Sequence, residues 1–104
     1  MKKSIFLFLA VSVMMSAANS IDKNSCSLNG VKLAGKVKVV NSFADFKVKK
    51  VSSFPDIEVK EVKSFPDDCG EWKFVESFPD FTIQYVESFP DFTIRMVNSF
   101  PGVK

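Results

Sequence analysis

The sequence predicts an all-β fold, a compact small domain of short strands joined by proline-containing turns. The tetrapeptide Ser-Phe-Pro-Asp, or a variant that differs at one residue, occurs six times after the first thirty residues. Its phenylalanines are Phe43, Phe54, Phe65, Phe78, Phe89 and Phe100, so the repeat is eleven residues long with one two-residue insertion at the centre. Six similar units favour a repetitive architecture over a catalytic centre, which needs a few unlike groups.

Each repeat contains a segment in which apolar and polar residues alternate, which is typical of a strand with one buried face. In the unit that begins at Val75, the residues Phe81, Ile83 and Tyr85 alternate with polar ones. The equivalent apolar positions are Phe46 and Val48, Ile57 and Val59, and Phe92, Ile94 and Met96. Prolines at positions 55, 66, 79, 90 and 101 exclude a long helix, because proline breaks a helix interior.

The Phe-Pro steps are expected at bends or strand ends, since proline keeps the preceding residue extended and donates no hydrogen bond. We expect each neighbouring aspartate to bond within its own turn, and the six turn phenylalanines to point inward and dominate the core. Three units precede Gly70 and three follow it, so we expect two similar halves. The period alone fits a β-solenoid, a strand meander or a closed β-body whose halves interlace.

Residues 1–20 have the pattern of a Sec signal peptide. Lys2 and Lys3 precede an uncharged stretch from Ile5 to Met15, and small residues suited to cleavage after Ala18 or Ser20 follow it. The stretch is shorter than the roughly 20 apolar residues that cross a bilayer, so we expect no stable membrane insertion after cleavage. Residues 21–104 are then a single SFPD-repeat β domain, expected to be a monomer in the periplasm or outside the cell.

The two cysteines of this domain, Cys26 and Cys69, are expected to form a disulfide bond, since small exported domains commonly depend on such bridges. A metal-binding pair fits less well, because the chain has no Cys-x-x-Cys spacing and no histidine. Without Lys2 and Lys3, twelve basic residues stand against twelve acidic ones, which argues against a nucleic-acid partner. The first half is the more basic and the second the more acidic, so we expect the halves to attract each other.

Several segments together resemble the 7(1) septoil knot domain family. They are the run from Cys26 through Gly35 to Phe43, the serial SFPD units, the Cys69-Gly70-Glu71-Trp72 insert and the terminal Ser99-Phe100-Pro101-Gly102. The resemblance covers essentially the whole mature chain, with Ala44 in place of proline and Gly102 in place of aspartate. It implies a deeply knotted, interlaced β-fold, a 7(1) torus knot with seven crossings, which most folds avoid. The family implies no activity, substrate or catalytic residue.

For function, we expect a noncatalytic, exported structural or binding module with no cofactor and with a protein or glycan as partner. The sequence has no histidine, no glycine-rich phosphate loop and no nucleophile elbow. One alternative is a Ca²⁺-binding module that uses the turn aspartates Asp45, Asp56, Asp67, Asp80 and Asp91. Another is a secreted inhibitor. Trp72, Tyr85 and Phe74 are candidates for an exposed aromatic patch, although such residues are more often packed in a core.

Overall fold

The computed structural model describes residues 21–104, so the predicted signal peptide lies outside the described part of the chain. The described residues form the strands β1 (Ser27–Leu28), β2 (Val31–Lys32), β3 (Gly35–Val39), β4 (Phe46–Lys50), β5 (Ile57–Glu61), β6 (Glu71–Phe74), β7 (Phe81–Tyr85), β8 (Phe92–Met96) and β9 (Gly102–Val103). The prediction of an all-β fold is confirmed. No helix within residues 21–104 has the length and apolarity needed to span a membrane.

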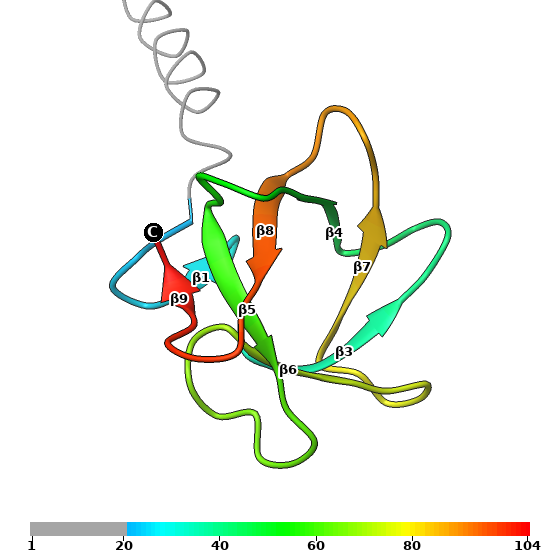
Figure 1. Cartoon of the computed structure of the whole chain (residues 1–104). Coiled ribbons are helices and arrows are strands. Elements are labelled where there is room, and N and C mark those ends of the chain that lie inside the picture. The colour runs from blue at the N-terminus through cyan, green and yellow to red at the C-terminus, as the bar shows by residue number, and fades with distance from the viewer. Residues whose placement is uncertain (1–20) are drawn as a thin grey trace, which may run out of the picture.

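Six of these strands form a closed parallel barrel, seen nearly end-on in Figure 1. The order around the barrel is β6-β3-β7-β4-β8-β5, and β5 pairs with β6 to close it. The short strand β9 lies antiparallel beside the start of β5, and β1 and β2 form a separate hairpin. Of the three architectures that the repeat allows, the molecule has the closed β-body whose halves interlace.

The interlacing follows from the register of the strands. Val39 at the end of β3 and Phe46 at the start of β4 both pair with Ile83, from its two sides. The turn between them, residues 40–45, therefore carries the chain across β7. The same crossing recurs along the chain, so every barrel strand has neighbours only from the other half. The expectation of two similar halves is confirmed, and they alternate around the barrel.

The inward-facing residues form three tiers of six, each spaced along the chain like the turn phenylalanines. The floor tier consists of Gly35, Phe46, Ile57, Gly70, Phe81 and Phe92, all buried. The middle tier consists of Val37, Val48, Val59, Trp72, Ile83 and Ile94, all with no exposed surface. The mouth tier consists of the strand-end residues Val39, Lys50, Glu61, Phe74, Tyr85 and Met96, all partly or well exposed. The predicted alternation is therefore correct, and two tiers supply most of the core.

The N-terminal segment packs against this core. Leu28 and Leu33 are buried in the same apolar cluster as the barrel residues. The carbonyl of Leu33 accepts hydrogen bonds from the amide of Gly70 at 3.0 Å and from the indole N–H of Trp72 at 3.1 Å. A disulfide bond joins Cys26 to Cys69, as predicted, and links this segment to the insert before β6.

Candidate binding site

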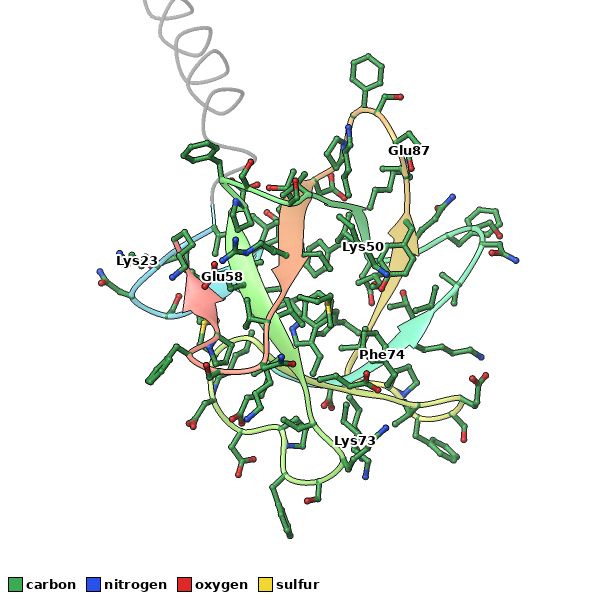
Figure 2. All side chains as sticks on the ribbon, viewed as in Figure 1. Lys23, Lys50, Glu58, Lys73, Phe74 and Glu87 are labelled. Atoms are coloured by element: carbon green, nitrogen blue, oxygen red, sulfur yellow. A yellow bond between two sulfur atoms is a disulfide. The ribbon has the colours of Figure 1, made fainter. Side chains whose placement is uncertain are left out.

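The six turn phenylalanines point outward, so the prediction that they dominate the core is wrong. Their exposed fractions are 100% for Phe43, 95% for Phe54, 81% for Phe65, 87% for Phe78, 92% for Phe89 and 87% for Phe100. Aromatic rings project from the connections around the circumference of the barrel in Figure 2. The core has no room for them, because the strand residues of the floor and middle tiers already fill it.

The backbone explains this direction. All six phenylalanines have a positive φ, between 49° for Phe65 and 56° for Phe43. In this left-handed conformation a residue with a Cβ costs roughly 1–2 kcal/mol relative to the right-handed one. The six turns therefore share one backbone conformation at the phenylalanine, and in each of them the ring is exposed to solvent. Strained, exposed aromatic residues on loops are a common sign of a binding role.

Within the described residues the turn aspartates do not use their carboxylates to cap their own turns, which corrects a second expectation. Four of them accept a hydrogen bond from a backbone amide of the strand that their turn crosses. The pairs are Asp45 with Thr82 at 2.9 Å, Asp56 with Thr93 at 2.8 Å, Asp80 with Lys36 at 2.8 Å and Asp91 with Lys47 at 2.7 Å. Each bond joins the two halves, so the aspartates fasten the crossings.

The five turn aspartates are not gathered at one place. Four of them lie on separate crossings, whereas Asp67 lies in the connection between the neighbouring strands β5 and β6. Within residues 21–104 no group of three His, Cys, Asp or Glu side chains is suited to hold a metal ion. The oxygen-rich cluster that a Ca²⁺ ion needs is therefore not assembled from these residues in the described part of the chain.

The mouth of the barrel forms a second candidate site. A cavity of about 490 Å³ lies there, lined by Lys50, Lys60, Glu61, Phe74, Tyr85, Met96, Val97 and Asn98. The ammonium group of Lys50 lies 4.7 Å from the centre of the Tyr85 ring. Burial raises the pKa of Tyr85, and the negative charge of Glu61 raises it further. Lys50 and Phe74 both lie toward the middle of the end-on view in Figure 2.

The three residues considered for an aromatic patch are divided between core and mouth. Trp72 is fully buried in the core, while Tyr85 is 37% exposed and Phe74 is partly buried. The sequence analysis missed Lys50 and Glu61 as site residues. A signal was present, because these two charged residues occupy the repeat position at which Tyr85 and Met96 stand in other units.

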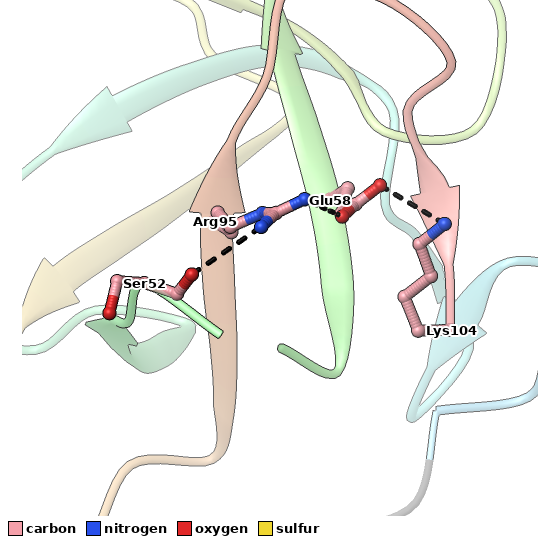
Figure 3. Close-up of polar contacts among 4 residues, drawn as sticks. All are labelled: Ser52, Glu58, Arg95 and Lys104. Atoms are coloured by element: carbon pink, nitrogen blue, oxygen red, sulfur yellow. Dashed lines mark hydrogen bonds and ion pairs between the residues drawn. The ribbon is translucent and has the colours of Figure 1, made fainter. Parts of the chain in front are cut away.

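A polar network on the outside of β5 joins the halves (Figure 3). Glu58, 8% exposed, lies 2.7 Å from Arg95 and 3.0 Å from Lys104, and Arg95 also donates to the carbonyl of Ser52 at 3.4 Å. The hydrogen bond from Lys104 lowers the pKa of Glu58, and both positive charges add to this effect against the opposing effect of burial. Here the acid belongs to the first half and the bases to the second. In these ion pairs the signs are the reverse of those expected from the sequence, which placed the basic residues in the first half and the acidic residues in the second.

The closed barrel of parallel strands, with its two halves alternating, defines this chain as a small knotted all-β domain. The family model of the 7(1) septoil knot domain matches residues 30–104. The chain therefore belongs to the 7(1) septoil knot domain family, as its resemblance implies. A search of curated proteins gave no match.

Proposed function

We propose that this protein is an exported, noncatalytic binding module that contacts its partner through the turn phenylalanines. The observation that carries the proposal is that six phenylalanines, each at least 81% exposed, share one strained backbone conformation. A buried phenylalanine contributes up to about 150–250 Å² of contact area, and rigidly held aromatic residues dominate the binding energy of many interfaces.

The scaffold is suited to present such side chains. Two buried tiers and a disulfide bond stabilise the domain, and the aspartate hydrogen bonds hold four of the turns against the strand that each one crosses. A rigid loop loses little conformational entropy when it binds, so more of the contact energy appears as affinity. The same aspartates are engaged with backbone amides, and this structural use of the turn carboxylates supports a noncatalytic role.

The location is part of the same proposal. Residues 1–20 have the pattern of a signal peptide, and disulfide bonds persist mainly in oxidising compartments. Cell fractionation and N-terminal sequencing of the natural protein test it. A mature protein that begins near Ile21 in the periplasm or culture fluid is expected. Full-length protein confined to the cytoplasm would contradict export.

Affinity capture with a matched variant tests the binding role. The disulfide-bonded protein is immobilised beside a variant in which Phe43, Phe54, Phe78 and Phe89 are replaced by serine, and both are exposed to cell-envelope and culture-fluid fractions. We expect a protein or glycan that only the unchanged protein retains and that soluble domain displaces. Equal retention by the variant, at an unchanged melting temperature, would show that the phenylalanines are not the contact.

A further inference from the structure

The mouth tier differs from the two tiers beneath it because it contains charged residues at inward-facing positions. Floor and middle tiers are apolar or glycine throughout, whereas Lys50 and Glu61 occupy the mouth tier beside Phe74, Tyr85 and Met96. Apolar residues at positions 50 and 61 would close the barrel and stabilise it by burial. The charged pair therefore needs an explanation that packing alone does not supply.

The arrangement around the cavity separates the two charges. Lys50 ends β4 and Glu61 ends β5, and in the barrel β8, which ends at Met96, lies between those strands. Neighbouring strands lie about 4.8 Å apart, so the backbones of β4 and β5 are separated by roughly 10 Å. An apolar side chain thus lies between a positive and a negative group.

Neither charge is neutralised by the other. Among the ion pairs of the described residues, Glu61 is joined to Lys63 at 3.5 Å, and the side chain of Lys63 is 90% exposed. Exposed pairs of this kind contribute little and exchange easily. Lys50 lies over the Tyr85 ring, a contact that leaves its N–H groups able to donate to an anion.

We propose that the barrel mouth binds a small zwitterion with an apolar body, of the size and chemistry of an apolar dipeptide. Lys50 binds the carboxylate of the ligand and Glu61 binds its ammonium group. The apolar side chains of the ligand lie against Met96, Phe74 and Tyr85. The cavity of about 490 Å³ is large enough for such a molecule. A ligand with only one of the two charges leaves the other protein charge without a partner on the ligand, which lowers affinity. This site is distinct from the phenylalanine surface, and either proposal can fail without the other.

Calorimetric titration of the disulfide-bonded protein with leucyl-leucine tests the site. The N-acetylated dipeptide and the dipeptide amide, each of which lacks one charge, are titrated in parallel. We expect saturable binding at one site, with both blocked peptides at least about tenfold weaker. No saturable binding up to roughly 10 mM dipeptide, or equal binding of the blocked peptides, would overturn the proposal.

Charge variants assign the binding to the mouth. Lys50→Glu and Glu61→Lys are each expected to weaken leucyl-leucine binding at least about tenfold, whereas the double variant restores it because both charges remain and the ligand reverses. Lys47→Gln, on the exposed face of the same strand, is the control and should bind like the unchanged protein. A double variant that stays as weak as the single ones, while its melting temperature matches the original, would overturn the proposed recognition.

Discussion

The carboxylate of Asp80 accepts a hydrogen bond from the backbone amide of Lys36 at 2.8 Å, across 44 positions of sequence. The backbone N–H of Asp80 in turn donates to the carbonyl of Lys36 at 2.7 Å. A turn of the second half is thereby fixed to a strand of the first. The same pair of bonds recurs between Asp91 and Lys47.

Replacing Asp80 with alanine should lower the free energy of unfolding by about 1 kcal/mol, because one hydrogen bond to a charged acceptor is lost at an exposed site. Asp67→Ala is the matched control, since the Asp67 side chain has no hydrogen bond within the described residues. Chemical denaturation measures the free energy of unfolding of both variants. Equal effects of the two substitutions would show that the bond to Lys36 does not stabilise the crossing.

The Glu58 network should make stability depend on pH. The folded protein lowers the pKa of Glu58 below its ordinary value of 4.5, so the ionised group stabilises the fold above that pH. The stabilisation is lost as the pH falls through the folded-state pKa. Glu58→Gln should therefore be less stable than the original at pH 7, and the difference should shrink in acid. Denaturant midpoints across this range measure it, and a difference that is independent of pH would contradict the prediction.

The disulfide bond should stabilise the fold without determining it. Its cysteines are separated by 43 positions, and closing a loop of this size contributes up to about 4 kcal/mol on the chain-entropy model. The double variant Cys26→Ser with Cys69→Ser should unfold at lower denaturant but keep the β signature in circular dichroism, because all barrel pairings remain. Reduced original protein is the control and should behave like the variant. A random-coil spectrum for both would show that the barrel needs the bridge.

Gly70 and Gly30 form a matched pair for testing close packing. Their φ angles are nearly equal, at 83° and 84°, so an alanine is strained at both. At Gly70 the added Cβ would lie 2.6 Å from the carbonyl oxygen of Glu58, whereas at Gly30 nothing lies within 4 Å. We expect Gly30→Ala to cost about 1 kcal/mol and Gly70→Ala roughly 3 kcal/mol or more. Similar unfolding free energies for the two variants would contradict this packing.

Substitution of a turn phenylalanine should change the stability much less than substitution of a strand phenylalanine. Asparagine tolerates a positive φ, so Phe78→Asn removes an 87% exposed ring without adding backbone strain. The free energy of unfolding should therefore change by less than about 0.5 kcal/mol. Phe81→Ala removes a buried ring and should cost about 3–5 kcal/mol. Thermal and denaturant unfolding of both variants checks the contrast. A large loss for Phe78→Asn would mean that the ring packs against the protein in solution.

The sequence predicted strands well and turn directions poorly, for a physical reason. Alternation at Phe81, Ile83 and Tyr85 is a local property, so it could be recognised without the fold. The outward direction of Phe78 depends on the positive φ at that residue and on a core already filled by other residues. Neither is visible in the turn sequence, where hydrophobicity alone predicts burial.

The hydrogen bonds of the turn aspartates to distant strands could not be predicted from the sequence either. Asp80 meets Lys36 only because the second half crosses the first, and the period of the repeat does not specify that crossing. The interlaced arrangement came from the family resemblance instead. At the mouth, the position of Lys50 and Glu61 in the repeat could have indicated an unusual tier, but the cavity depends on the closure of the barrel.

The alternation of the halves has a consequence for a chain that is still being synthesised. The strands β3, β4 and β5 have no barrel partner among themselves, because each pairs only with strands that are made later. A chain that has been made only as far as Lys63 can therefore form the β1–β2 hairpin but none of the strand pairings of the barrel. Every pairing of the barrel therefore has to wait for a strand of the second half.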